Sequence, residues 1–419
     1  MSEINKVLCG VILPLFLLGA GLFFAIKLKF FYIFKPIKAI KSMVGCRGGF
    51  SSLCVALAGT LGVGNIVGVA SAILGGGYGS IFWMWVSAIF SMSLKYAEVV
   101  LAMKHRKIKS GKYYGGAPYY IYEGFLKKCG KKASFILASA FAVLCTINSL
   151  TTGNLVQANA ISGIFKIPKF ILGLLFTTFA VLVVCRGIKR ISKFTSVLIP
   201  VLSVFYICIC TIILIKNISS VPYAFKVIFE SAFNLKSASF GVLGFGISRA
   251  IRYGISRGLL SNEAGSGTAP CAHASSNAEN AHSQGCLGIF EVFFDTIVLC
   301  TLTALVIIIS GVFSSENAMD LVLDSFELNL GSIGRYGVLI SCLLFSFATV
   351  ITQYFYGKES LSFISRSKIF KIAFTVLFFL VTFVSFLIPM SVMWEIADLV
   401  LAIMTIFNLA CLLLLHKQI

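Results

Sequence analysis

Residues 59–68 read GTLGVGNIVG and set polar side chains beside four glycines within an otherwise apolar stretch. Glycine tolerates conformations that end a helix, and an ended helix leaves amides and carbonyls without partners. Free amides at a helix N-terminus attract an anionic group, whereas free carbonyl and amide oxygens are hard ligands for a small cation. The run therefore predicts a site that binds a carboxylate and a cation together.

The expected ligands come from both sides of this interruption. We expect the amides of Gly62, Gly64 and Asn65 to meet the carboxylate. Sodium is the obvious candidate for the cation, and its expected ligands are oxygens of Ala58, Thr60, Leu61 and Asn65. The alternative is close helix packing, since Gly64 and Gly68 have the G-x-x-x-G spacing. Asn65 favours a site, because polar residues within spans are costly and usually functional.

The composition places this site in a membrane protein. The chain has 419 residues, of which 58% are hydrophobic and 12% charged, with a mean hydropathy of +0.97, and these values exclude a soluble domain. A basic run follows the apolar stretch 7–26, so we expect a retained span there rather than a signal peptide. The 13 cysteines are scattered singly and are interpreted as small buried apolar residues.

Apolar runs of about 20 residues predict membrane-spanning helices. The sequence contains eleven such runs, at about 7–26, 52–74, 80–103, 134–163, 168–185, 194–216, 237–260, 285–312, 333–357, 369–389 and 394–415. We therefore expect an all-α polytopic membrane protein with eleven transmembrane helices.

The net charge of +20 is an orientation signal. Most Lys and Arg residues, including the groups at 27–47, 104–132, 186–193, 249–257 and 358–371 with Lys417, fall on one side of the predicted spans. Only Lys6, Lys166, Lys169, Lys216, Lys226, Lys236 and Arg335 fall on the other, which also carries the acidic segment 316–327. The positive-inside rule then predicts a plasma-membrane protein with its N-terminus outside and its C-terminus in the cytoplasm. No basic stretch is interleaved with exposed aromatics, so we expect no nucleic-acid partner.

The eleven spans divide into one leading helix and two sets of five. The first helix of the second set carries GVLGFGISRAIRYG at 241–254, which resembles the glycine-rich run in the first helix of the first set. Paired interruptions at corresponding positions indicate an inverted repeat with a midplane site. We expect residues 1–50 to form an extra helix and a basic cytoplasmic loop, and 51–419 to form a core with repeats at about 51–217 and 237–417.

Four segments resemble, in order, the alanine/glycine:cation symporter family. They are the run from Gly59 to Glu98, NLVQAN at 154–159, RYGISRGLLSNEAGSGTAP at 252–270 followed by SQG and FDTIVLCT within 283–301, and FATVITQYFYGKE at 347–359. The match extends over about residues 50–415. The resemblance implies a leucine-transporter-like fold, with five plus five helices in inverted repeat, two broken helices and one extra helix.

The resemblance also implies a function and a set of contacts. The expected function is symport of a neutral amino acid with a cation by alternating access, without an organic cofactor and by a monomer. Thr349 would add a hydroxyl to the cation or substrate site, and Asn154 and Gln157 would hydrogen-bond the substrate. The expected substrate contacts are Thr60, Gly62, Gly64, Asn65, Asn154, Gln157, Gly254, Thr349 and Gln353, and Thr349 joins the expected sodium ligands.

The sequence departs from the family pattern at four positions. Val63 replaces a usual Thr and Ala348 a usual Ser, and each change removes a hydroxyl that could face a cation. Gln353 stands where a Trp commonly closes a small pocket, and Gly59 replaces an Ala. An amide in place of an indole predicts a roomier and more polar pocket, so the substrate is alanine or glycine or a more polar amino acid such as glutamine or serine.

Other polar residues have structural or gating interpretations. Lys95 and Glu98 lie three apart on one predicted helix, so we expect an ion pair, with gating as the alternative. Glu263 is placed at the inner end of the second broken helix, where it would anchor Arg252 or Arg257 in a gate or structural role. The four histidines map to cytoplasmic loops or ends, and His273 and His282 lack the helical zinc spacing.

Two other function classes remain open. A channel would need a continuous polar pore and would show neither saturation nor counterflow. An intramembrane enzyme would need a nucleophile facing a base, and the nearest pair is Ser261 and His273 in a predicted loop. The channel is the first alternative, and we do not expect an enzyme.

Overall fold

A computed structural model describes residues 5, 7–46, 48–109, 111–163, 165, 167–185, 187–233, 240–312, 317–388 and 390–419. Five cations of the predicted charge pattern lie outside these residues, namely Lys6, Arg47, Lys166, Arg186 and Lys236, as does Glu316 of the acidic segment. The described chain is helical apart from one antiparallel hairpin of β1 (Lys107–Lys109) and β2 (Lys112–Tyr114). The predicted all-α class is confirmed.

The helices follow one another with short connections. The first half contains η1 (Leu8–Ile12), α2 (Leu13–Lys27), α3 (Phe31–Phe34), α4 (Pro36–Val44), α5 (Gly49–Thr60), η2 (Val63–Asn65), α6 (Val67–Gly76), α7 (Gly79–Lys104), α8 (Ala117–Leu150), η3 (Thr151–Leu155), α9 (Val156–Ala160), α10 (Lys169–Val184), α11 (Ile188–Lys216) and η4 (Ile218–Ser220). The second half contains α12 (Val221–Ala232), α13 (Phe240–Asn262), α14 (Pro270–Ala274), α15 (Ala281–Val292), η5 (Phe293–Cys300), α16 (Thr301–Ser310), α17 (Ala318–Ile364), α18 (Lys368–Ser385), α19 (Met390–Leu414) and η6 (His416–Gln418).

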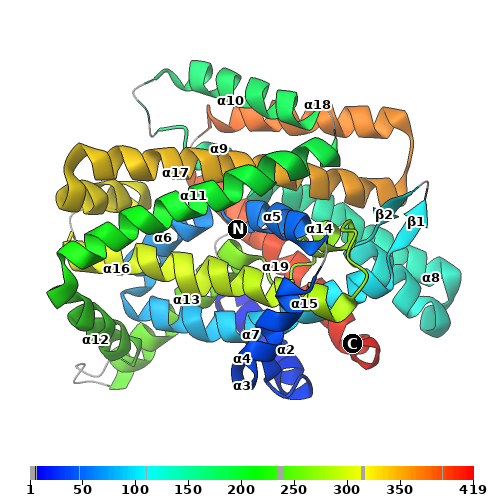
Figure 1. Ribbon diagram of the computed structural model, residues 1–419, viewed down its shortest axis with the longest axis horizontal. Coiled ribbons are helices and arrows are strands. Elements are labelled where there is room, and N and C mark those ends of the chain that lie inside the picture. Colours follow the sequence, from blue (N-terminus) through cyan, green and yellow to red (C-terminus); the bar gives the residue numbers. More distant parts are fainter. Residues whose placement is uncertain are drawn as a thin grey trace.

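The helices form a bundle whose long members α7, α11 and α17 run along the long axis of the molecule (Figure 1). Among the described residues, eight helices are long and apolar enough to cross a membrane, and α5, α6 and α10 are shorter apolar helices. The hairpin and the C-terminus lie toward one end of the bundle, and α12 lies toward the other (Figure 1). The count of eleven spans stays a prediction.

The first predicted interruption is confirmed. Helix α5 makes its last intrahelical bond from the Leu61 amide to the Leu57 carbonyl, and the chain is extended at Gly62 before the short helix η2. Helix α6 resumes at Val67. The glycine-rich run therefore separates two half-helices, as its composition predicts.

The second interruption is not where the glycines predicted it. Helix α13 continues through Gly254, where an added Cβ would lie 2.3 Å from the Ser80 carbonyl oxygen. Gly254 therefore allows close packing of α13 against α7. The actual break follows at 263–269, where Glu263, Gly265 and Gly267 have positive φ angles of 48°, 84° and 83°. Glycine has no Cβ and so adopts positive φ angles without a steric clash, which explains why two of these three positions are glycines.

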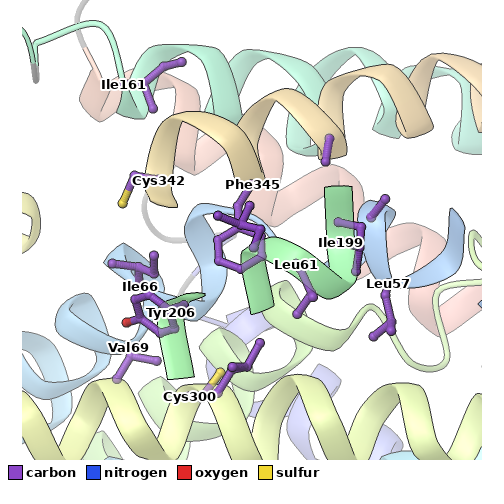
Figure 2. Packing of buried hydrophobic residues seen from close by; sticks show 14 of the residues in the cluster. Leu57, Leu61, Ile66, Val69, Ile161, Ile199, Tyr206, Cys300, Cys342 and Phe345 are labelled. Atoms are coloured by element: carbon purple, nitrogen blue, oxygen red, sulfur yellow. The ribbon is translucent and has the colours of Figure 1, made fainter. Parts of the chain in front are cut away.

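Apolar residues of the first broken helix form the centre of the largest core cluster (Figure 2). Leu57 of α5, Leu61 directly after it and Ile66 beside η2 are packed with Tyr206 of α11 and Phe345 of α17. The Tyr206 hydroxyl bonds the Thr303 hydroxyl of α16 at 2.7 Å. The break is thus held by packing on several sides rather than exposed to lipid, as backbone without helical partners requires.

Two arginines assigned to the cytoplasmic side lie at the opposite end of the bundle. The Arg252 side chain lies 3.4 Å from the position of a Cβ on Gly10, near the start of the first span, whereas Lys27 at the end of that span bonds the His416 carbonyl near the C-terminus. Arg257 pairs with Asp398 in the first half of α19. These contacts place both arginines toward the end of the bundle opposite Lys27 and Lys417, so they do not share a side with those lysines as predicted.

Candidate functional site

Asn65 connects the first break to the rest of the site. Its side-chain oxygen accepts from the Gly62 amide at 3.1 Å, and its side-chain nitrogen donates to a carboxylate oxygen of Asp295 at 2.8 Å. The Asn65 carbonyl accepts from the Thr303 hydroxyl at 2.8 Å. Asn65 is only 1% exposed, so these bonds fix the loop between α5 and α6 against η5 and α16.

Asp295 is the central residue that the sequence analysis missed. It lies fully buried in the π-helical segment η5, and its second carboxylate oxygen accepts from Ser261 at 2.7 Å and Thr296 at 2.8 Å. Ser261 belongs to the end of α13, directly before the second break. Asp295 therefore joins the two interrupted segments. An aspartate within the apolar run FFDTIVLC was the signal that could have identified it.

Gly62, Gln157 and Thr349 meet at the extended turn. The Val63 amide donates to the Gln157 side-chain oxygen at 2.9 Å, and a Cβ on Gly62 would lie 2.5 Å from that oxygen. The same Cβ would lie 2.8 Å from the Thr349 hydroxyl, which donates to the Leu61 carbonyl at 3.0 Å. Any side chain at 62 would displace these groups. The structure thus brings five predicted site residues together, namely Leu61, Gly62, Asn65, Gln157 and Thr349.

Gly64 and Ala58 are buried beside this group. A Cβ on Gly64 would lie 3.0 Å from Cα of Ser261, so the two broken segments are in close contact. Ala58 lies in the last turn of α5 and is fully buried.

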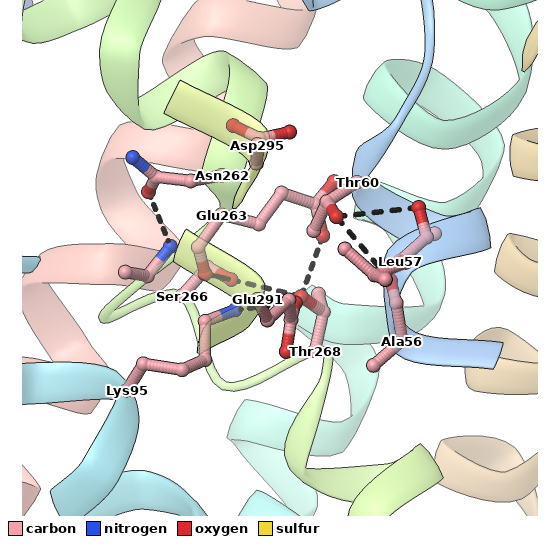
Figure 3. A network of polar contacts seen from close by, with 12 residues as sticks. Ala56, Leu57, Thr60, Lys95, Asn262, Glu263, Ser266, Thr268, Glu291 and Asp295 are labelled. Atoms are coloured by element: carbon pink, nitrogen blue, oxygen red, sulfur yellow. Dashed lines mark hydrogen bonds and ion pairs between the residues drawn. The ribbon is translucent and has the colours of Figure 1, made fainter. Parts of the chain in front are cut away.

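Two polar residues of the predicted site, Thr60 and Asn154, form hydrogen bonds with backbone carbonyls of the helix bundle. The Thr60 hydroxyl donates to the carbonyls of Ala56 at 3.4 Å and Leu57 at 3.3 Å in its own helix (Figure 3). The Asn154 side chain donates to the Phe378 carbonyl of α18 at 2.9 Å. In this conformation both make the interhelical or intrahelical bonds that compete with a ligand role.

The Gln353 side chain packs against neighbouring residues. Its nitrogen donates to a Glu263 carboxylate oxygen at 2.9 Å, and a Cβ on Gly153 would lie 2.4 Å from its Cγ. In this conformation Gln353 packs closely against Gly153 and bonds Glu263, and the roomier pocket stays a prediction. The Gln353 side-chain oxygen is buried without a hydrogen-bond partner, so it can accept one from a polar ligand.

Glu263 does not anchor an arginine. Its second carboxylate oxygen accepts from the Thr268 hydroxyl at 2.5 Å across the second break (Figure 3). Arg257 instead pairs with both oxygens of Asp398, at 3.0 and 3.1 Å, and lies over the Trp394 ring. The prediction was wrong because Asp398 of α19 engages Arg257, whereas Glu263 lies beyond the end of α13 and bonds Thr268 and Gln353.

Lys95 pairs across helices and not with Glu98. Its ammonium lies 3.2 Å from Glu291 of α15, and both side chains are fully buried (Figure 3). Glu98 accepts from the Gly267 amide at 2.8 Å and the Asn408 side chain at 2.6 Å. The expected pair along one helix was therefore wrong. Its members serve two different contacts, one to α15 and one to the second break and α19.

His273 is buried and not part of a solvated loop. Its Nε2 lies 3.0 Å from Glu291, and its Nδ1 lies 2.8 Å from the Gln284 side-chain nitrogen. The same nitrogen of Gln284 donates to the Ser52 hydroxyl of α5 at 2.7 Å. This chain of contacts connects the buried Lys95–Glu291 pair to the first half of the broken helix. Ser261 contacts Asp295, so no Ser261–His273 pair is formed.

The buried charges at the breaks are unbalanced. Four carboxylates, those of Glu98, Glu263, Glu291 and Asp295, have no exposed surface or almost none. Among the described residues, Lys95 forms a buried ion pair with Glu291, and His273 Nε2 contacts the same carboxylate at 3.0 Å. A buried carboxylate is costly unless a cation or proton neutralises it. The buried carboxylates near the breaks therefore require either a cation or a proton as a partner.

A cavity of 480 Å³ lies beside α5 at the end of the bundle that carries the hairpin. Its lining includes Ser52 of α5, Tyr114 of β2, Ser192 of α11, Cys271 of α14 and Lys358 of α17. These elements surround the half of the broken helix that precedes Gly62. The cavity has both polar and apolar lining and borders the first half of α5, before the break.

Comparison with known proteins identifies the family to which this chain belongs. The model of the sodium:alanine symporter family matches residues 1–419. The chain belongs to the sodium:alanine symporter family. It is 36% identical over 433 residues to the sodium/alanine symporter AgcS of Methanococcus maripaludis, with 99% of this chain and 94% of the relative covered. It is 31% identical to the probable sodium/glutamine symporter GlnT of Bacillus subtilis, with 99% and 87% covered.

The fold is similar to that of solved transporters. A structure of a Na⁺-coupled sialic acid symporter superimposes with a TM-score of 0.51 at 12% identity, covering 99% of this chain and 82% of that one. The predicted leucine-transporter-like fold is confirmed at this level. Family membership also makes the chain a multi-pass secondary transporter of the membrane and not an enzyme.

Proposed function

We propose that this protein imports a neutral amino acid together with sodium by alternating access around the two helix breaks. The observation that carries the proposal is the contact of Asn65 in the first break with Asp295, which also binds Ser261 before the second break. A transporter whose two broken helices share one buried carboxylate can couple a cation to movement of both. The family supports sodium as the coupling ion.

The substrate carboxylate is expected at the extended turn. In this conformation Asn65 and Gln157 side-chain oxygens accept from the amides of Gly62 and Val63. An incoming carboxylate presents the same kind of acceptor and would replace them at these donors. The substrate contacts are proposed as before, namely Thr60, Gly62, Gly64, Asn65, Asn154, Gln157, Thr349 and Gln353. Gly254 is omitted because it lies within the continuous helix α13 and packs against α7.

The cation is proposed to bind between α5 and α17, close to Asp295. Leu61 offers its carbonyl to the Thr349 hydroxyl, and both are oxygen ligands of the kind sodium takes. The proposed set is Ala58, Thr60, Leu61, Asn65 and Thr349, with Asp295 as nearby negative charge. One sodium ion moving down a tenfold gradient and about 100 mV releases roughly 3.7 kcal/mol, which is enough to accumulate substrate a few hundred-fold.

The substrate is proposed to be alanine, glycine or a more polar neutral amino acid. Relatives named for sodium/alanine and sodium/glutamine symport support this range. The unpartnered Gln353 oxygen favours a polar side chain. Gln353→Trp should shift the ranking toward alanine and glycine in competition uptake. If alanine and glycine outcompete every polar amino acid in the wild type, the polar preference is wrong.

Topology and gating complete the proposal. We infer eleven spans as one leading helix plus a five-plus-five inverted repeat, with domains at 1–50 and 51–419 and repeats at about 51–217 and 237–417. The N-terminus would lie outside and the C-terminus inside, in a monomer. The contacts of Arg257 with Asp398 would then lie on the outer side, and Arg252 near them. Lys95, Glu98 and Glu263 would have gating or structural roles in the cytoplasmic half of the protein.

Binding to the purified protein tests this function. Labelled alanine and glutamine should bind with sodium present and much more weakly when choline replaces sodium. Asn65→Ala and Gln157→Ala should lose binding while retaining the thermal stability of the folded protein. Sodium-independent binding, or wild-type binding by both variants, would refute the proposed site. Flux that does not saturate and shows no counterflow in liposomes would favour a channel instead.

A further inference from the structure

The chain changes direction abruptly after the first span. Helix α2 ends at Lys27, and the next turn places Lys29 and Phe30 in the left-handed region with φ of 53° and 47°. Helices α3 and α4 then follow at the edge of the bundle beside α2 and α7 (Figure 1). The helix formed by Leu8–Lys27 is long and apolar enough to cross a membrane, so its end places α3 and α4 at the membrane surface.

One side of this segment is attached to the bundle. The Tyr32 hydroxyl donates to the Ile89 carbonyl of α7 at 3.0 Å, and the Phe31 ring contacts Tyr96 edge-on. Ala39 of α4 is buried in the same cluster as Tyr96. The segment therefore has a fixed orientation, and its opposite side faces away from the protein.

The outward side of α3 and α4 is apolar. Phe34, Ile37, Ile40 and Val44 are 75%, 68%, 53% and 84% exposed. Ile37, Ile40 and Val44 are spaced three and four residues apart and lie along one side of α4, and Phe34 ends α3 directly before it. We call these four residues the apolar stripe. An exposed stripe of this kind on a helix next to a membrane span is typical of a helix that lies in the bilayer interface.

Lysines flank the apolar stripe. Lys35, Lys38 and Lys41 are exposed, and no acidic residue occurs between positions 27 and 47. Within the described part of the chain none of the three has an ion-pair partner. Lysine stems can lie along apolar surface while their ammonium groups reach the headgroup level. Three unpaired cations at this depth are complementary to the anionic lipids of a cytoplasmic leaflet.

We propose that α3 and α4 form a lipid-binding surface for anionic phospholipids. The apolar stripe enters the acyl-chain boundary, and Lys35, Lys38 and Lys41 bind the phosphate-bearing headgroups. The surface lies apart from the helix breaks and takes a ligand that is not transported. It adjoins α5, because only residues 45–48 separate α4 from that half-helix.

Fluorescence quenching by brominated phospholipids tests the surface directly. The full-length protein carrying Val44→Trp is reconstituted in vesicles of phosphatidylcholine with a fixed fraction of phosphatidylglycerol, and the bromines are placed on one lipid or the other. The three native tryptophans give the background from the wild type. Both brominated lipids should quench Trp fluorescence at position 44, and brominated phosphatidylglycerol should quench about twofold more at equal mole fraction.

The charge dependence has a matched control. Lys35→Gln, Lys38→Gln and Lys41→Gln together should abolish the preference for phosphatidylglycerol. Lys127→Gln, Lys131→Gln and Lys132→Gln, which remove equal charge from exposed positions of α8, should leave it unchanged. Should Val44→Trp not fold, Ile40→Trp reports on the same stripe.

Three outcomes would overturn the proposal. Absence of quenching would mean that protein, such as a second copy of this chain, covers the apolar stripe. Equal quenching by the two lipids would remove the headgroup selectivity. A preference that survives the triple Lys35, Lys38 and Lys41 substitution would show that other groups bind the lipid. None of these readouts depends on transport, so a failure here leaves the proposed symport untouched.

Discussion

At the scale of single residues, Asn65 and Asp295 carry the account. Asn65 uses its oxygen to hold the Gly62 amide and its nitrogen to hold Asp295, so the amide side chain bridges the backbone turn and the buried carboxylate. The Asp295 carboxylate accepts three side-chain hydrogen bonds. Among the described residues it has no ion-pair partner. Donors of this kind stabilise a charged carboxylate without neutralising it, which suits a site that must bind and release a cation.

Asp295→Asn should weaken sodium binding while preserving the size of the side chain. Removal of the buried negative charge takes away attraction for a cation at the breaks, and we expect the sodium concentration for half-maximal amino-acid binding to rise about tenfold or more. Asp320→Asn removes a charge from the exposed start of α17 and should leave that concentration unchanged. An unaltered sodium dependence in Asp295→Asn would remove Asp295 from the cation site.

At the scale of elements, the two breaks differ in how they are made. The first uses an extended glycine between two half-helices, and side chains from α9 and α17 close around it. The second uses residues with positive φ between α13 and α14. Both are lined by buried polar side chains, which satisfy backbone groups that would otherwise be stranded in an apolar environment.

Gly62→Ala should disable the first break. An added Cβ would lie 2.5 Å from the Gln157 oxygen and 2.8 Å from the Thr349 hydroxyl, so both groups must move. Gly68→Ala is the matched control, because the nearest atom to its Cβ would lie 3.9 Å away. We expect amino-acid binding to fall at least tenfold in Gly62→Ala and by less than twofold in Gly68→Ala. Equal effects would mean that the turn tolerates a side chain.

The buried Lys95–Glu291 pair should stabilise α7 against α15. Lys95→Met leaves Glu291, among the described residues, with His273 as its remaining basic contact, and loss of one member of a buried pair costs about 3–5 kcal/mol. The melting temperature in detergent should therefore fall. The double change Lys95→Met with Glu291→Gln should recover much of the loss. A melting temperature unchanged in the single variant would show that the pair contributes little.

At the scale of the whole molecule, composition and periodicity were sufficient for the class and the first break. The glycines beside Asn65 correctly predicted the interruption, because a polar residue within a span is costly and usually functional. The glycines before residue 254 misled, since glycine serves close packing as readily as a break. The true second break contains Glu263 at a positive φ, a conformation that residue type does not reveal.

Partners distant in sequence were beyond local reasoning. Lys95 and Glu98 are neighbours along a helix, but Lys95 pairs with a residue 196 positions away. His273 and Glu263 likewise are buried by segments that come together only in the folded bundle. Family resemblance supplied Gln157 and Thr349 but not Asp295, which required the three-dimensional arrangement.

Sodium-driven uptake of a labelled amino acid into liposomes tests the central claim most directly. Purified protein should accumulate the amino acid above the external concentration when sodium is higher outside, and the accumulation should collapse when the sodium gradient is dissipated. Asn65→Ala should abolish accumulation without loss of folded protein. Equal uptake with and without the gradient, or full accumulation by Asn65→Ala, would contradict a cation-coupled symporter built on this break.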